Sequence, residues 1–115
     1  MDNVVSVLTY KSAGHIIGDG GSQAWRADRS RLRKAKYLVA ARHAHSPFKV
    51  EGHEPHRHAF LVGLISDVVD ADRDFEAEHH PETKPRNKIR FSRYALIDGP
   101  ELPLAGQNPV QYWPD

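Results

Sequence analysis

Residues Ala59 to Val69 read Ala-Phe-Leu-Val-Gly-Leu-Ile-Ser-Asp-Val-Val and form the most apolar stretch of this 115-residue chain. Apolar side chains fall on both alternating faces, which is typical of a strand covered on both sides. We therefore expect the central strand of a sheet here. A glycine within a strand indicates a bulge or a close backbone approach, and Gly63 predicts one of these.

Other segments rich in β-branched and aromatic residues lie on both sides of this stretch and predict further strands at Val4–Tyr10, Tyr37–Arg42, Lys88–Ile97 and Val110–Trp113. Between the first two, Asp28 is placed to cap a short helix that runs to Lys36, in which only Leu32 and Ala35 can face inward. No segment sustains a 3.6-residue period, which excludes a helical bundle. The predicted fold is one mostly β (α+β) domain over residues 1–115, a five- to six-stranded pseudo-barrel or rolled sheet with one short helix.

Composition narrows the functional classes. The chain has no cysteine, so disulfides and thiolate metal sites are excluded. No apolar run approaches the length of a membrane span, and the first residues lack the basic start of a signal peptide, so we expect a cytoplasmic protein with no membrane partner. The formal net charge of +1 argues against bulk electrostatic binding of duplex DNA.

The small net charge hides a marked asymmetry along the chain. Arg26–Lys49 holds eight Lys or Arg against one acid, whereas Asp67–Glu82 holds seven acids against one Arg. Such a division can orient an anionic partner, or the two regions can be solvated faces that pair with each other. The second possibility keeps a protein-interaction module open, with dimers formed through the charge division.

Residues Ile16 to Trp25 read Ile-Ile-Gly-Asp-Gly-Gly-Ser-Gln-Ala-Trp and predict a glycine-rich loop with positive φ angles and exposed N–H groups. We expect this loop to deliver Ser22 and Trp25 to the mouth of a pocket. Asp19 places a negative charge where a phosphate would sit, and no Lys-Ser/Thr pair closes the loop. Binding of a nucleoside triphosphate is therefore not expected.

A set of aromatic residues is spread around the predicted pocket and could surround a flat ring: Tyr10, Trp25, Tyr37, Phe48 and Phe60. Arg26 or Arg42 would then meet a phosphate. Bases outside a duplex are held in this way, by stacking together with hydrogen bonds to their edges. Tyr37 and Phe60 also suit a core, whereas Trp25 has polar neighbours and favours recognition.

Five histidines lie between positions 43 and 58 and offer a metal-binding alternative. His43 and His45, followed by Glu51, resemble the first metal motif of the cupins, with one of His53, His56 or His58 as a further ligand. The glycine spacing differs from that motif, and the second cupin motif is missing. We therefore expect no metal, with this cupin-like small barrel kept as the alternative.

Covalent catalysis has little support in the sequence. There is no cysteine nucleophile, and none of the serines lies in a Gly-x-Ser-x-Gly elbow. We expect a binding domain rather than an enzyme, with no catalytic residues and no cofactor.

The order of segments resembles the PUA-like superfamily, nearest to its EVE-type and related stand-alone domains. Two stretches carry the resemblance: Ala59–Asp70, with its Gly-Leu-Ile-Ser-Asp-Val-Val pattern before an acidic stretch, and Arg86–Leu104, which ends in Pro-x-Leu-Pro-Leu. The resemblance implies a pseudo-barrel with a pocket that reads modified bases in DNA or RNA.

The same resemblance maps a site onto this chain. It implies that the pocket lies near the first loop and its flanking strands, which here corresponds to Tyr10, Lys11, Ser22, Trp25 and Arg42. It also implies that the basic run after the loop meets backbone phosphates through Arg29, Arg31, Arg33 and Lys34. Whether the partner is DNA or RNA stays open.

Overall fold

The computed structural model describes residues 3–71, 86–103 and 109–114 of the chain. Within them the elements follow in the order β1 (Val4–Thr9), α1 (Ala13–Asp19), β2 (Gly21–Trp25), α2 (Arg29–Lys34), β3 (Tyr37–Arg42), β4 (Ala59–Asp70), β5 (Asn87–Leu96) and β6 (Val110–Trp113). Most of the predicted acidic segment between β4 and β5, and the predicted Leu104 at the end of Arg86–Leu104, lie outside the described residues.

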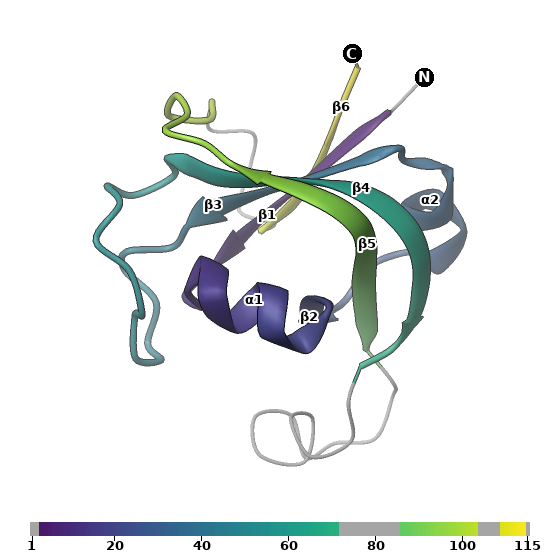
Figure 1. The fold of residues 1–115 in the computed structure, drawn as a ribbon, viewed down its shortest axis with the longest axis horizontal. Coiled ribbons are helices and arrows are strands. Elements are labelled where there is room, and N and C mark those ends of the chain that lie inside the picture. The colour runs from purple at the N-terminus through teal and green to yellow at the C-terminus, as the bar shows by residue number, and fades with distance from the viewer. Residues whose placement is uncertain (1–2, 72–85, 104–108, 115) are drawn as a thin grey trace.

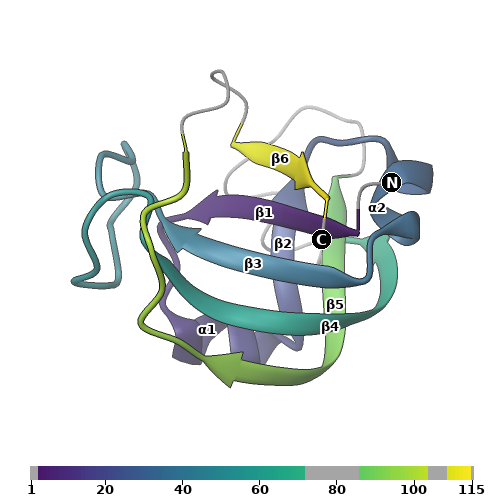
Figure 2. The same ribbon diagram turned by 90° about the horizontal axis from the view of Figure 1, so that it is seen from above.

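The six strands form one mixed sheet in the order β2-β5-β4-β3-β1-β6 (Figures 1 and 2). β1 and β3 run parallel, and the other neighbours run antiparallel. The two end strands, β2 and β6, do not pair with each other in the described chain, so the sheet is rolled and not closed. The prediction of a mostly β rolled sheet is confirmed.

The most apolar stretch forms β4, which lies inside the sheet between β3 and β5, as its two-sided apolar pattern predicts. Gly63 marks a close approach: a Cβ at this position would lie 2.9 Å from Cβ of Phe91 on β5. The pairing of β4 with β5 also shifts register between Leu64 and Ile65. The absence of a side chain at Gly63 therefore lets the two long strands pass closely. Both strands curve over α1 (Figure 1).

The core lies on the inner face of this curved sheet. Val5 and Val7 of β1, Leu38 of β3 and Leu61 of β4 are fully buried in it. Leu32 of α2 and Ala35, its C-cap residue, are buried in the core, as the sequence predicts. Asp28 caps the start of α2 by accepting hydrogen bonds from the N–H groups of Ser30 and Arg31. Burial of these apolar side chains supplies the main driving force for the fold.

A second helix, α1, and the strand β2 replace the predicted glycine-rich loop at Ile16–Trp25, so the expectations of one short helix and of a loop with exposed N–H groups are wrong. Ser12 caps α1 by accepting from the N–H of His15, and Gly20 ends it with φ of 76°. Gly20 is the one described glycine with positive φ, and its N–H bonds to the carbonyls of Ile16 and Ile17. The glycine thus terminates a helix instead of exposing N–H groups to a ligand.

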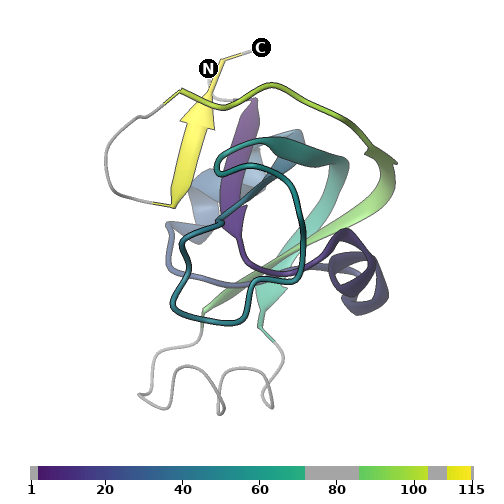
Figure 3. The same ribbon diagram turned by 90° about the vertical axis from the view of Figure 1, so that its left-hand side faces the viewer.

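The segment between β3 and β4, residues 43–58, forms an irregular loop at one end of the sheet (Figure 3). It is attached to the end of β1, because the N–H of Glu51 donates to the carbonyl of Tyr10 at 2.8 Å. In the described part of the chain, neither helix has the length and apolar character needed to span a bilayer.

Candidate functional site

A cavity of about 420 Å³ opens where the end of β1, α1, β2 and the 43–58 loop meet. Its wall combines aromatic, cationic and acidic side chains, with Arg86 and the start of β6 completing it. Five of the six residues predicted to contact a ligand line this cavity: Tyr10, Lys11, Ser22, Trp25 and Arg26. The sheet therefore brings together residues that the sequence separates, and Arg42 is the exception.

Three aromatic side chains line the cavity. The rings of Tyr10 and Phe48 are stacked, with centroids 4.9 Å apart, and Phe48 is 41% exposed. Trp25 is half-buried and packs against the core, and its indole Nε1 donates to Ser22 Oγ at 2.8 Å. The hydroxyl of Ser22 is buried and engaged by Trp25, so its observed role is to orient the indole.

Neither Phe60 nor Tyr37, the other two aromatic residues predicted for the pocket, lines the cavity. Phe60 is buried in the core, and Arg42 lies over its ring at 4.3 Å from the centroid. Tyr37 is half-buried on β3 and does not line the cavity. Phe60 is therefore a core residue, Tyr37 belongs neither to the buried core nor to the cavity wall, and Tyr10, Trp25 and Phe48 form the aromatic wall.

Arg42 is 1% exposed and is held inside the protein, so we withdraw its expected contact with a ligand. Its Nη1 donates to the carbonyls of Thr9 and Lys11, and its Nε donates to Glu54 at 2.9 Å. Burial would raise the pKa of Glu54, but hydrogen bonds and the charge of Arg42 outweigh it and hold that pKa below its ordinary value. Arg42 fixes the backbone that carries Tyr10 and Lys11.

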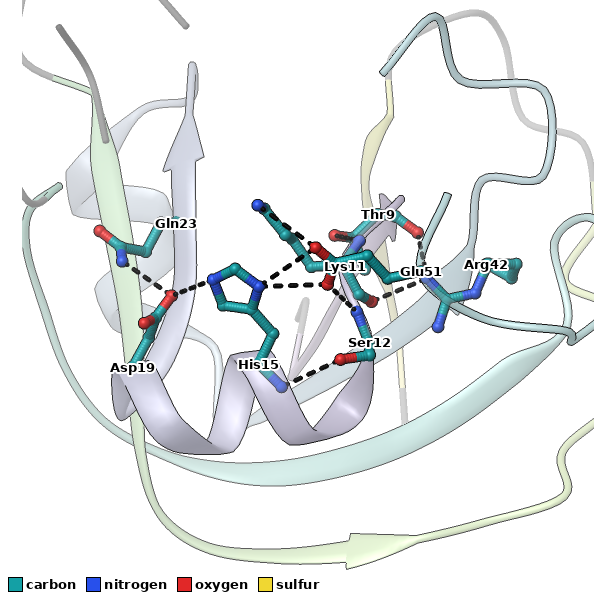
Figure 4. A network of polar contacts seen from close by, with 8 residues as sticks. All are labelled: Thr9, Lys11, Ser12, His15, Asp19, Gln23, Arg42 and Glu51. Atoms are coloured by element: carbon teal, nitrogen blue, oxygen red, sulfur yellow. Dashed lines mark hydrogen bonds and ion pairs between the residues drawn. The ribbon is translucent and has the colours of Figure 1, made fainter. Parts of the chain in front are cut away.

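A polar network connects α1 to the 43–58 loop beside the cavity (Figure 4). The His15 ring lies between two carboxylates: Nδ1 is 3.1 Å from Glu51 Oε1, and Nε2 is 3.4 Å from Asp19 Oδ2. Gln23 Nε2 also donates to Asp19 Oδ2 at 3.0 Å. Asp19 and Gln23 line the cavity, so the network holds two polar groups of its wall in place.

Glu51 anchors the other side of this network. Burial raises the pKa of its carboxyl, but hydrogen bonds from the N–H of Ser12 and from His15, together with the charge of Lys11, outweigh burial and lower the pKa below its ordinary value. Lys11 Nζ lies 3.7 Å from Glu51 and 5.1 Å from the centroid of Tyr10. The carboxylate therefore positions a cation beside the aromatic wall.

The basic run forms α2 and the residues around it, at the end of β4 (Figures 1 and 2). Arg29 pairs with Asp70 and donates to Asn87, Arg33 donates to the carbonyl of Val68, and the Arg31 guanidinium lies 3.7 Å from the centroid of Tyr112. Lys34 is exposed. These four cations do not line the cavity; among the described residues the cations that do are Lys11, Arg26 and Arg86.

The histidines of the 43–58 loop come together differently from the cupin-like expectation. His56 lies between His43 and His45, with ring centroids 5.4 Å and 4.3 Å away, while Glu51 belongs to the His15 network. Over residues 3–71, 86–103 and 109–114, no three His, Asp or Glu side chains are arranged to hold a metal ion. The geometry therefore does not assemble the His43, His45 and Glu51 set.

His43 also lines the cavity, and its Nδ1 is buried with no hydrogen-bond partner in the described chain. Burial, together with the neighbouring His45, lowers the pKa of His43 below its ordinary value. Burial likewise lowers the pKa of His56, helped by the nearby histidines. The lowered pKa favours the neutral form of the His43 ring at neutral pH.

Sequence reasoning did not identify His15 and Gln23 as residues of the site. The signal was present, because Ser12 and Gly20 carry the N-cap and C-cap chemistry of a short helix, and residues four apart on a helix share a face. His15 and Asp19 have this spacing. Arg86 carried no comparable signal, since only the sheet pairing brings it to the cavity.

Comparison with protein-family models, with curated proteins and with solved structures found no match to this chain.

Proposed function

We propose that this protein binds nucleic acid and receives an unstacked base in the cavity between β1, α1, β2 and the 43–58 loop. One observation carries the proposal: three aromatic side chains and three cations converge on a single cavity of about 420 Å³. This volume lies within the range of small-ligand sites. A base supplies a flat face for the aromatic wall, and its phosphate supplies a charge for the cations.

The aromatic wall suits stacking because one of its members is open to solvent. Phe48 is 41% exposed and stacks on Tyr10, so a base can extend this stack without displacing core residues. Trp25 is fixed by Ser22, which reduces the entropy lost when a ligand binds. Base–aromatic stacking contributes about 1–3 kcal/mol per base and tolerates any base.

The phosphate contacts are assigned to Lys11, Arg26 and Arg86, which line the cavity. The cations of α2 form a separate basic surface, in which the Arg29 and Arg33 side chains already contact Asp70, Asn87 and the Val68 carbonyl. We propose that this surface contributes longer-range attraction and that the cavity contributes the close contacts. The formal net charge of +1 agrees with recognition through a pocket and not through bulk charge.

The resemblance of Ala59–Asp70 and Arg86–Leu104 to PUA-like domains supports the same function. It extends the proposal to a modified base in cytoplasmic DNA or RNA, read in the cavity as EVE-type domains read theirs. The aromatic wall is suited to a modified base, because a methyl group adds apolar surface to be buried against it.

Removal of the exposed ring tests this proposal. Phe48→Ala should weaken binding of single-stranded oligonucleotides of about 10 nucleotides by about 5- to 150-fold, equivalent to about 1–3 kcal/mol, because one stacking surface is lost. Fluorescence anisotropy with DNA and RNA strands, unmodified and base-methylated, measures the affinity. Low salt, about 50 mM, keeps the phosphate contacts strong.

Tyr94→Ala is the matched control for this experiment. Tyr94 is an exposed aromatic residue on β5, 51% exposed, and it does not line the cavity. Its removal should leave affinity unchanged. Equal affinities for the wild type and Phe48→Ala would contradict the proposal, and so would the absence of any binding at low salt.

A further inference from the structure

Two residues that line the cavity, Asp19 and His43, each have a polar side-chain atom with no partner within the described chain. Both contacts of the Asp19 carboxylate fall on Oδ2, from Gln23 and His15, which leaves Oδ1 without a partner. His43 Nδ1 is buried and likewise unpartnered. Only the His43 nitrogen is buried, where an unmade hydrogen bond is costly. Asp19 is partly exposed, so its Oδ1 can accept a hydrogen bond from a ligand that enters the cavity.

The chemistry of Asp19 restricts that ligand. An ionised carboxylate accepts hydrogen bonds and donates none. Its orientation is set in advance, because Gln23 donates to Oδ2 at 3.0 Å and Gln23 lies on the adjacent strand β2. The Asp19 side chain is 29% exposed, so its charge is only partly screened by solvent. A ligand group that carries its own lone pairs would be repelled from Oδ1.

We propose, resting on the function proposed above, that Asp19 is the specificity determinant of the cavity and selects bases with an exocyclic amino group over their oxo counterparts. The amino group donates to Asp19 Oδ1 while the ring stacks on the aromatic wall. An oxo base places a carbonyl oxygen toward the same carboxylate.

Nucleoside monophosphates that differ at this group provide the test. Adenosine, cytidine and guanosine monophosphates each carry an exocyclic amino group. Uridine monophosphate is the counterpart of cytidine monophosphate, with an oxygen in place of the amino group. Inosine monophosphate is the counterpart of both purines, because it has neither the amino group of adenine nor that of guanine. Calorimetric titration of the wild type should show that at least one nucleotide with an amino group binds at least about tenfold tighter than the counterpart that lacks it. The reason is that a site built to accept a hydrogen bond from the ligand rejects analogues without the donor.

Asp19→Asn keeps the shape of the side chain but introduces an amide donor. The preference should fall at least about tenfold or reverse toward the oxo base. Asp67→Asn is the matched control, because it makes the same change at an exposed aspartate that pairs with Arg90 and does not line the cavity, and it should keep the wild-type preference. Thermal unfolding of each variant checks that it is folded.

The outcomes separate this inference from the proposed function. The role of Asp19 would be overturned if each nucleotide with an amino group bound with the same affinity as its counterpart without it. It would also be overturned if Asp19→Asn kept the wild-type preference for the amino group. Either result would leave base binding intact. If the wild type binds none of the five monophosphates, while oligonucleotides also fail to bind, both proposals are overturned. Oligonucleotide binding without any monophosphate binding would overturn only the role of Asp19.

Discussion

At the scale of single residues, Arg42 shows how a charged side chain can serve a site without contacting a ligand. Its guanidinium is almost fully buried and connects the ends of β1 and β3 to the 43–58 loop. The loop passes so closely that a Cβ at Gly52 would lie 2.5 Å from Arg42 Nη2. The position of Tyr10 and Lys11 in the cavity wall depends on this arginine.

Arg42→Met should lower the free energy of unfolding by about 2–5 kcal/mol, because the carbonyls of Thr9 and Lys11 lose their donor inside the protein. Urea unfolding followed by circular dichroism measures this loss. Arg93→Met is the control, since Arg93 is exposed on β5, and it should shift the midpoint little. Equal midpoints for the two variants would show that Arg42 does not stabilise the fold.

Individual residues of the site were predictable where their chemistry is unusual for a core. Trp25 has polar neighbours and a serine three positions before it, and both Trp25 and Ser22 line the cavity. The burial of Arg42 was not predictable. Local sequence does not show whether an arginine at the end of a strand faces solvent or contacts backbone carbonyls that lie 31 and 33 positions away in the chain. Such contacts depend on the sheet pairing.

At the scale of elements, α1 is the least predictable part of the fold. Gly14 and Gly18 lie within it, and glycine has low helix propensity, so the segment resembles a loop. Tertiary packing overrides this preference, because Ile16 is buried and Ile17 packs against the core. β3 and β4, by contrast, follow from their apolar patterns within one residue of their predicted ends, and α2 follows from the Asp28 cap but ends two residues before the predicted Lys36.

The link between α1 and the 43–58 loop gives a pH-dependent prediction. The pKa of Glu51 is lowered in the folded protein, so its carboxylate contributes stability above its ordinary pKa, and that contribution disappears as pH falls through the lowered value. Glu51→Gln should therefore be less stable than the wild type at about pH 7, and the difference should shrink as pH falls below the ordinary glutamate pKa of about 4.3. Urea midpoints of both proteins across this range measure the difference.

Glu101→Gln is the control for this comparison. Glu101 pairs with Arg57, but its side chain is 52% exposed, and exposed ion pairs contribute little to stability. Its substitution should change the urea midpoints less than Glu51→Gln at neutral pH. A Glu51→Gln deficit that stays constant from neutral to acidic pH would contradict the role given to its carboxylate.

At the scale of the whole molecule, the site exists because the sheet rolls. β2 pairs with β5 and not with β1, its neighbour in sequence, and this pairing brings Ser22, Trp25 and Arg86 to the end of β1. Strand positions were predictable from local patterns, with the exception of β2. The order of strands and the parallel pairing of β1 with β3 were not, because they depend on contacts between distant segments.

The distribution of charge over the whole molecule predicts how salt affects binding. If only Lys11, Arg26 and Arg86 contact phosphates, the logarithm of the association constant should fall with the logarithm of salt concentration with a slope of about −2, since each contact on a single strand contributes about −0.7. Affinities at several salt concentrations measure this slope. A slope near about −5 would show that the four cations of α2 also contact phosphates.

The central claim is that the cavity beside Trp25 receives a base, and the two tryptophans of the chain test it directly. Trp25 lines the cavity, whereas Trp113 lies on β6 with its indole Nε1 donating to Ser6 Oγ at 2.7 Å. A ¹⁵N–¹H spectrum shows each indole N–H as a separate signal. Titration with the tightest-binding oligonucleotide should shift the Trp25 signal and leave that of Trp113 in place, while saturating binding that leaves the Trp25 signal unmoved would contradict the claim.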